Sequence, residues 1–204
     1  MPSNDSHPSP VVYRFEHEII CHIVEEGCKV LDLGCGEGDL LKLLGDRRKV
    51  QGTGVEVSEQ KVYECIHKGL SVHHGDIDEG LSDYPDKSFD YVILSETLQE
   101  VHKPRLVIKD MLRVGKKGIV SFPNFGFWKG RLQLLFLGRS PMTQTLPFDW
   151  YETPNIHFFT IKDFFHFCER ERVQVVQSVF IYKGREITLL PNLLADSALF
   201  ILGG

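Results

Sequence analysis

A glycine-rich loop preceded by an acidic residue is the segment of this sequence best suited to bind a charged small molecule. Residues 30–38 read VLDLGCGEG, so an apolar run leads through Asp32 into glycines at positions 34, 36 and 38. Glycine accepts positive φ angles and lets a ligand lie against the main chain. A loop of this kind, directly after a strand and at the start of a helix, is the setting in which nucleotide-like ligands are bound.

The carboxylate of Asp32 narrows the class of ligand. It would repel a pyrophosphate, and the spacing G-x-G-x-G differs from the G-x-G-x-x-G of dinucleotide-binding loops. S-adenosylmethionine carries an ammonium and a sulfonium, so a negative charge suits it. We therefore expect the loop to bind S-adenosylmethionine or S-adenosylhomocysteine. The alternative, a nicotinamide dehydrogenase, is disfavoured, and fluorescence titration with NADH tests it directly.

Acidic residues follow the next two predicted strands, where they could hold a nucleoside. Glu56 lies 24 positions after Asp32, near the spacing at which an acidic residue accepts hydrogen bonds from ribose hydroxyls. Asp76 and Ile77 are expected at the adenine, and Ser95 below the methionine moiety. The predicted cofactor-binding residues are Asp32, Gly34, Cys35, Gly36, Gly38, Glu56, Val57, Asp76, Ile77 and Ser95.

The elements that must position these residues alternate between strands and helices. Apolar and β-branched runs predict strands at residues 29–33, 51–57, 70–74, 89–95, 117–122, 174–182 and 197–202. Helical spacing predicts helices at 11–25, 39–44, 58–68, 106–114 and 161–170, with Ser58 and Thr160 as N-caps of two of them. This order predicts an α/β, Rossmann-like fold, a mainly parallel seven-stranded sheet with an antiparallel last strand and helices on both faces. Ligands of such sheets bind outside the carboxyl ends of the strands.

Residues 11–204 are expected to form a single domain, behind a polar, proline-rich lead-in at residues 1–10 that we expect to be disordered. Residues 123–154, after the fifth strand, form a long aromatic-rich insertion, of which 128–137 could be a short amphipathic helix. A connection of this length is usually a lid or a binding loop. Three of its aromatic side chains, Trp128, Trp150 and Tyr151, could stack on a methyl acceptor, anchor a partner protein, or pack as a small satellite core.

Composition argues against several other classes of function. The 204 residues carry a formal net charge of −5 and no block of Lys and Arg, so we expect no nucleic-acid partner. No apolar run approaches the roughly 20 residues of a membrane-spanning helix, and the first residues lack the apolar centre of a signal peptide. The five cysteines include no C-x-x-C pair. We therefore expect no metal site and no disulfides, but reduced thiols in a cytoplasmic protein.

Together these motifs resemble those of class I S-adenosylmethionine-dependent methyltransferases and, over nearly the whole chain, those of the MetW family of methionine biosynthesis proteins. The resemblance is carried by LDLGCGEG at 31–38, GTGVE at 52–56, GDI at 75–77, FDYVILSETLQ at 89–99, SFPNFG at 121–126 and WYETPNIH at 150–157. The last three are more specific than the glycine loop, because generic methyltransferases lack them in that form. The resemblance implies a role in methionine biosynthesis and a homoserine O-acyltransferase as partner. One local departure is RFEH at 14–17, where we would expect an arginine followed closely by an aspartate.

The sequence leaves open whether the protein catalyses methyl transfer. The sulfonium is already activated, so holding donor and acceptor in line is the main requirement and no catalytic dyad is needed. The protein could be an active small-molecule methyltransferase, or a ligand-binding partner subunit that reports the state of the pathway to the acyltransferase. His157 is a candidate general base, or else a cap of the next helix or a polar filler near the ligand. His102 is expected at the rim of the cleft, and Cys35 as a packing residue whose thiol pKa is raised by Asp32 and Glu37.

Overall fold

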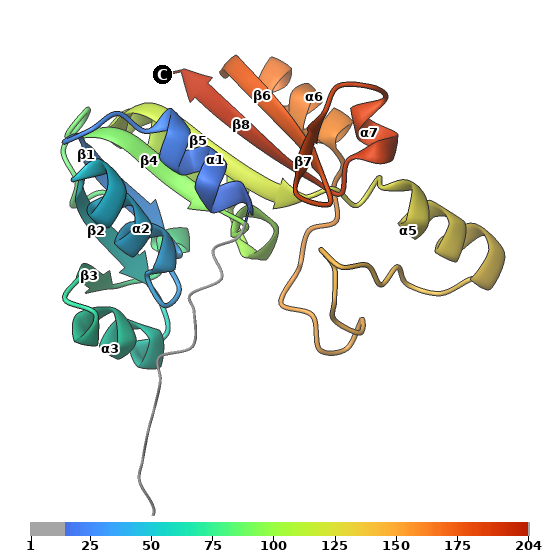
Figure 1. Ribbon diagram of the computed structural model, residues 1–204, viewed down its shortest axis with the longest axis horizontal. Coiled ribbons are helices and arrows are strands. Elements are labelled where there is room, and N and C mark those ends of the chain that lie inside the picture. Colours follow the sequence, from blue (N-terminus) through green and yellow to red (C-terminus); the bar gives the residue numbers. More distant parts are fainter. Residues whose placement is uncertain (1–14, 204) are drawn as a thin grey trace, which may run out of the picture.

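A sheet of eight strands runs through residues 15–203, the part of the chain that the computed structural model describes (Figure 1). The strands are β1 Lys29–Leu33, β2 Gln51–Glu56, β3 Ser71–His74, β4 Phe89–Ser95, β5 Gly115–Pro123, β6 Gln174–Tyr182, β7 Arg185–Ile187 and β8 Ser197–Gly203. Their order across the sheet is β3-β2-β1-β4-β5-β8-β6-β7. Strands β1 to β5 pair in parallel, whereas β8 is antiparallel to β5 and β6, and β7 is antiparallel to β6. The predicted α/β, Rossmann-like class is confirmed.

The predicted number of seven strands is wrong, because β7 adds an eighth within residues 15–203. It pairs with β6 across the turn at Lys183 and Gly184, and three residues are too few to show the alternation of apolar and polar side chains that marks a strand. The antiparallel last strand predicted at 197–202 is confirmed as β8. The lead-in predicted at 1–10 lies outside the described residues, as does the start of the helix predicted at 11–25.

Helices cover both faces of the sheet and bury its apolar side chains. They are α1 Phe15–Ile23, α2 Asp39–Arg48, α3 Glu59–His67, α4 Pro104–Val114, α5 Trp128–Leu132, α6 Ile161–Glu171 and α7 Pro191–Leu194, with the short helical turns η1 Ile77–Glu79, η2 Leu98–Glu100 and η3 Gln133–Leu137. Successive residues of β1 show why both faces are covered, because Val30 belongs to the core cluster that includes residues of α1 and α2, whereas Leu31 belongs to the one that includes residues of α4 and α6. None of the helices within residues 15–203 combines the length and the apolar character needed to cross a membrane.

The order of the strands reverses at β1. The chain first moves outward from β1 to β2 and β3, and then returns to place β4 and β5 on the other side of β1. Loops that leave β1 and β4 at such a reversal diverge, which opens a crevice at the carboxyl ends of the strands. The glycine-rich loop follows β1, and the acidic segments follow β2 and β3. The topology therefore brings the predicted ligand-binding segments to one edge of the sheet.

Two predicted helix caps differ in outcome. Thr160 forms a capping box at the start of α6, since its hydroxyl accepts the N–H of Asp163 while the Asp163 carboxylate accepts the N–H of Thr160. Ser58 stands at the N-cap of α3, but its side chain makes no capping bond within the described structure. Its N–H donates to the carboxylate of Glu56 at 2.9 Å instead. The capping role predicted for the Ser58 side chain is therefore wrong.

The insertion at 123–154 leaves the sheet after β5. Its predicted helix is confirmed as α5 followed by η3, and Figure 1 shows both projecting away from the sheet. Trp128 is partly buried and its ring packs edge-on against that of the buried Phe127, whereas Trp150 and Tyr151 are 73% and 65% exposed. A satellite core therefore accounts for Trp128 but is contradicted for Trp150 and Tyr151. For these two, contact with an acceptor or with a partner protein stays open.

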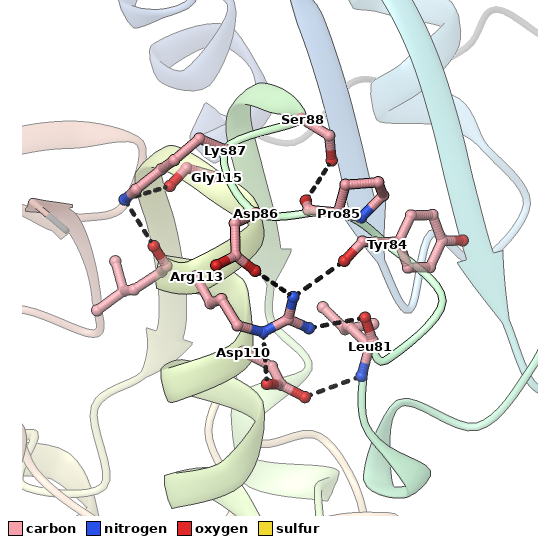
Figure 2. Close-up of polar contacts among 10 residues, drawn as sticks. Leu81, Tyr84, Pro85, Asp86, Lys87, Ser88, Asp110, Arg113 and Gly115 are labelled. Atoms are coloured by element: carbon pink, nitrogen blue, oxygen red, sulfur yellow. Dashed lines mark hydrogen bonds and ion pairs between the residues drawn. The ribbon is translucent and has the colours of Figure 1, made fainter.

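Arg113 in α4 holds the connection that leads into β4 (Figure 2). Its guanidinium donates to the carbonyl oxygens of Leu81 and Tyr84, at 2.8 and 2.9 Å. It also pairs with the carboxylates of Asp86 and Asp110, at 2.8 and 3.3 Å. Since two of these partners are backbone groups, the cluster fixes the connection against α4 and with it the start of β4.

Candidate functional site

A cavity of about 1250 Å³ opens at the carboxyl edge of the sheet, where the loops after β1, β2, β3 and β4 meet. Nine of the ten predicted cofactor-binding residues line it, namely Asp32, Gly34, Cys35, Gly36, Glu56, Val57, Asp76, Ile77 and Ser95. In the described structure Gly38 and the candidate base His157 are not part of its wall. The fold therefore gathers residues from four separate segments around one space large enough for a nucleoside ligand.

The glycine-rich loop turns sharply because Gly34, Gly36 and Gly38 have positive φ angles, of 71°, 56° and 79°. A Cβ at Gly34 would meet the Thr97 methyl group at 2.6 Å, so this glycine allows the loop to pack under β4's connection. A Cβ at Gly36 would meet no described atom within 4 Å, so this position leaves open space. Gly38 instead fits the loop against α3, since its Cβ would lie 2.9 Å from the Sγ of Cys65.

Asp32 in β1 is a buried acidic residue whose hydrogen bonding is incomplete within the described structure. It is 2% exposed, and its Oδ1 accepts no hydrogen bond from any residue of the described chain. Burial, with a smaller contribution from the charge of Glu56, raises the pKa of the Asp32 carboxyl from 3.8 to about 7. A buried acceptor without a donor costs free energy. A ligand that donates a hydrogen bond and carries positive charge would remove this cost.

Glu56 at the end of β2 fastens the glycine loop to the neighbouring strand. Its Oε2 accepts the N–H of Gly36 and its Oε1 accepts the N–H of Ser58, both at 2.9 Å. The side chain is 6% exposed and lines the cavity. An ionised carboxylate has about four acceptor positions, so about two remain for a ligand. The ribose contact predicted for Glu56 is compatible with this geometry.

Asp76, Ile77 and Ser95 stand on the wall where the adenine and methionine ends are predicted. The Asp76 carboxylate is held in place because its Oδ1 accepts the N–H of Asp78 at 2.8 Å, at the start of η1. Ile77 packs partly against the core and offers an apolar surface. The Ser95 hydroxyl lies 3.2 Å from that of Ser121, which is fully buried. These side chains are therefore positioned by the protein before any ligand arrives.

The Cys35 thiol is packed under the loop. Burial is the main cause that raises its pKa, and the charge of Asp32 and the neighbouring Cys65 add to it. The predicted direction is confirmed, although Glu37 is not among the causes. A thiol with a raised pKa stays protonated at neutral pH and is a poor nucleophile. The five cysteines are free, and no three His, Cys, Asp or Glu side chains within residues 15–203 are grouped to hold a metal ion.

The two histidines singled out from the sequence lie in different places. His157 donates its backbone N–H to the Gln99 carbonyl oxygen at 2.9 Å, and its ring Nε2 is buried without a hydrogen-bond partner in the described part of the chain. The alternative in which His157 caps the next helix is wrong, because Thr160 is that cap. His102 lines the cavity, as expected of a rim residue, and its N–H donates to Asp78 at 2.9 Å.

Sequence reasoning missed wall residues that lie outside the glycine loop and the acidic strand ends. Gln99 is 5% exposed, lines the cavity and leaves its Oε1 without a partner among the described residues. It belongs to the run at 89–99 that carries the family resemblance, which is the signal that could have singled it out. Glu16 and Asp196 also line the cavity, but they lie far apart in the sequence. No local motif could have joined them.

Comparison with known proteins adds a sequence family. The model of the family described as "Methionine biosynthesis protein MetW" matches residues 14–202. A bifunctional methionine biosynthesis protein MetXA/MetW from Rhodopirellula baltica is 37% identical over 204 residues, covering 94% of this chain and 33% of that protein. A demethylmenaquinone methyltransferase from Geobacillus stearothermophilus is 34% identical over 105 residues, covering 48% of this chain and 45% of that protein. The chain thus spans a third to a half of the length of the curated relatives it matches.

Solved structures of low sequence identity share the fold. S-adenosylmethionine-dependent methyltransferases from Thermotoga maritima and Archaeoglobus fulgidus superpose on the chain with TM-scores of 0.64 and 0.66. The superpositions cover 93% and 92% of this chain, and 88% and 94% of those proteins. Sequence identities of 19% and 15% limit this likeness to the arrangement of the elements.

Proposed function

The chain belongs to the MetW family of methionine biosynthesis proteins, and from this premise we propose that it binds S-adenosylmethionine and acts with a homoserine O-acyltransferase. The observation that carries the proposal is the buried Asp32 carboxylate on the cavity wall, whose Oδ1 has no donor among residues 15–203. An ammonium group would supply the missing hydrogen bond and the compensating charge together.

The neighbouring wall residues suit the remaining parts of the same ligand. Gly36 leaves room for a ligand to lie against the loop backbone, and Glu56 has unused acceptor positions for ribose hydroxyls. Ile77 offers an apolar face next to the polar Asp76 for a purine. S-adenosylmethionine, when bound, supplies a methyl group already activated on a sulfonium. The task of the protein side chains is to hold the ligand in one orientation and to balance its charge.

The partnership with an acyltransferase is supported by the family and by the make-up of one relative. The name of the Rhodopirellula baltica protein joins MetXA to MetW, and this chain corresponds to 33% of its length. S-adenosylmethionine is made from methionine, so a subunit that binds it can report the output of the pathway. Regulation of this kind requires S-adenosylmethionine to change the affinity for the partner, and by linkage the partner changes the affinity for S-adenosylmethionine equally.

Calorimetric titration with S-adenosylhomocysteine tests the binding site. We expect saturable binding by the wild-type protein, and loss of binding in Gly36→Val, because the new side chain would fill the space that Gly36 leaves open. Gly69→Val is the matched control, since Gly69 also has a positive φ, of 74°, and a Cβ there meets no described atom within 4 Å, but that residue lies outside the cavity wall. Equal affinities of both variants for S-adenosylhomocysteine, or tight binding of NADH instead, would place the ligand elsewhere.

Co-expression with a homoserine O-acyltransferase tests the partnership. The expected result is a complex that co-purifies, and an acyltransferase rate that changes when S-adenosylmethionine is added. The Gly36→Val variant should still form the complex but should lose the response to S-adenosylmethionine. Separate elution of the two proteins, with an unchanged acyltransferase rate, contradicts the proposed partnership while leaving the binding site intact.

A second candidate function, methyl transfer to a small molecule, is favoured by the size of the cavity. Its volume of about 1250 Å³ exceeds the roughly 300–1,000 Å³ of a typical small-molecule pocket, so an acceptor could lie beside the donor. Holding the two in line would supply most of the rate enhancement. The test is incubation with methyl-labelled S-adenosylmethionine and a cell extract. Labelled product formed by the wild type and absent with Gly36→Val supports transfer, and no labelled product with either rejects it.

A further inference from the structure

Buried acidic groups continue along the cavity beyond the proposed S-adenosylmethionine site. Within residues 15–203, four Asp or Glu residues are at most 9% exposed, and every one of them lines this cavity: Glu16, Asp32, Glu56 and Asp196. Asp32 and Glu56 are accounted for by the proposed ligand. Glu16 in α1 and Asp196 just before β8 are not.

The strand order separates these two pairs of carboxylates. Asp196 stands at the start of β8, where its carbonyl oxygen accepts the N–H of Asn124 at the end of β5. Strands β4 and β5 lie between β1 and β8, so Asp32 and Asp196 are three strand spacings apart. Three spacings amount to about 14 Å. A single amino group therefore cannot neutralise both ends of the cavity.

The carboxylates at the far end accept hydrogen bonds from neutral donors, which do not balance their charge. The Ser197 hydroxyl donates to Glu16 Oε1 at 2.7 Å, and the N–H of Lys183 donates to Asp196 Oδ2 at 3.0 Å. Burial, reinforced by the charge of Glu16, raises the pKa of Asp196. The two acidic groups thus lie close enough to repel each other, and a cation between them would relieve that repulsion.

A third acceptor, Gln99, stands on the same wall in the connection after β4, between the two ends. Its Nε2 donates to the Glu96 carbonyl oxygen at 2.6 Å, which leaves Oε1 as the free atom. That oxygen is buried and has no donor in the described part of the chain. Two basic residues also line the cavity here: Lys183 holds its ammonium over the Tyr182 ring at 5.5 Å, and His17 follows Glu16 in α1. The acceptors that a ligand can meet at this end are the carboxylates of Glu16 and Asp196 and the Oε1 of Gln99.

We propose that this end of the cavity, formed by Glu16 and Asp196 and bordered by Gln99, binds a second small molecule that carries a protonated amine. The proposal rests on the proposed function in that S-adenosylmethionine fills the other end. An ammonium group has three donors and no acceptor, which matches a wall of two carboxylates and one amide oxygen. A neutral alcohol of the same shape brings one donor and no charge, and an anion would be repelled by both carboxylates.

The first test compares two ligands that differ in charge and hardly in shape. Protein saturated with S-adenosylhomocysteine is titrated with n-butylamine and, separately, with n-butanol. The expected result is binding of the amine at least ten times tighter than binding of the alcohol. Equal affinities, or no binding of n-butylamine at the highest concentration that leaves the protein folded, overturn the proposal. Because wild-type protein is used throughout, no variant needs to fold.

The second test assigns the effect to the far end of the cavity. Glu16→Gln keeps an oxygen for the Ser197 hydroxyl and should weaken n-butylamine binding at least fivefold, with the affinity for S-adenosylhomocysteine unchanged. Glu186→Gln is the matched control, because it removes the same charge from an exposed residue of the nearby β7. Equal n-butylamine affinities in both variants contradict the proposed site. If the wild-type protein did not bind S-adenosylhomocysteine, the proposed function would be contradicted instead. Titration of the ligand-free protein with n-butylamine would then still test the site at the far end.

Discussion

The polar cluster around Arg113 and the one around Asp32 both bring charged groups against the sheet, but they differ in how far the protein completes them. All three guanidinium nitrogens of Arg113 donate to protein oxygens (Figure 2). Asp32 is almost fully buried, and its Oδ1 has no donor in residues 15–203. The first cluster joins a loop to a helix, and the second lines a cavity.

The difference shows how a buried polar group that lacks a hydrogen-bond partner can be interpreted. A buried polar atom without a partner reduces stability, so in a folded protein it calls for an explanation such as an ion or a ligand. Arg113 has a raised pKa because its acidic partners stabilise its charge, whereas Asp32 has a raised pKa because burial destabilises its charge. The Arg113 cluster therefore contributes to folding, while Asp32 reduces stability until a cationic ligand binds.

The sharpest test of the comparison is Arg113→Met, which keeps a long side chain and removes every charge-assisted hydrogen bond of the cluster. We expect unfolding free energy to fall by about 3 kcal/mol, because two backbone carbonyls and the Asp110 carboxylate lose their donors. For a chain of this size that is a fall in Tm of about 6–12 °C. The measurement is denaturant or thermal unfolding. Affinity for S-adenosylhomocysteine should stay within twofold, and a larger loss would show that the two clusters are coupled.

The converse change, Asp32→Asn, should weaken ligand binding without lowering the free energy of unfolding. The amide cannot balance an ammonium, so we expect S-adenosylhomocysteine affinity to fall by about 2 kcal/mol, or roughly thirtyfold. Stability should be unchanged or higher at pH 7.5. The reason is that the folded-state pKa of Asp32 lies above its unfolded value, so ionisation of this group lowers stability as pH rises from about 4 to 7. Calorimetry and unfolding on the same samples check both parts, and a clear loss of stability at pH 7.5 would make Asp32 a structural residue.

The two clusters differ in how much of each can be predicted from the sequence alone. Asp32 is predictable because its motif is local: residues 30–38 run from within β1 through the turn to Gly38, the N-cap of α2. The Arg113 cluster has no local motif, since its partners lie 27 to 32 positions earlier, except for Asp110. Sequence periodicity predicted β1 to β6, β8 and the main helices, but a three-residue strand such as β7 gives too short a pattern. The far end of the cavity could not be predicted, because Glu16 and Asp196 meet only through the fold.

The pH dependence of binding sharpens the assignment of the ligand charge to Asp32. With a pKa of about 7 in the ligand-free protein, the ionised fraction of Asp32 falls from about three quarters at pH 7.5 to about one tenth at pH 6.0. Since only the ionised form balances an ammonium, S-adenosylhomocysteine affinity should fall about eightfold over this range, or roughly 1.2 kcal/mol. Calorimetry at both pH values measures it. The Asp32→Asn variant should lose this dependence, and a variant that retained it would assign the titrating group to another residue.

The smallest effect is expected from Asp86→Asn, which separates exposed from buried partners inside the Arg113 cluster. The Asp86 side chain is 73% exposed although it lies 2.8 Å from Arg113, whereas Asp110 is 17% exposed and also accepts the N–H of Leu81 at 2.9 Å. Water and salt screen an exposed ion pair, so Asp86→Asn should change the unfolding free energy by no more than about 0.5 kcal/mol.

Asp110→Asn should lower the unfolding free energy more than Asp86→Asn does, because a buried backbone N–H depends on the Asp110 carboxylate. Urea unfolding of the two variants at low and high salt measures the difference. If Asp86→Asn lowered the unfolding free energy as much as Asp110→Asn, the Arg113 cluster would be stabilised by charge attraction in general. The complete hydrogen bonding of its buried groups would then not be what distinguishes it from the site around Asp32.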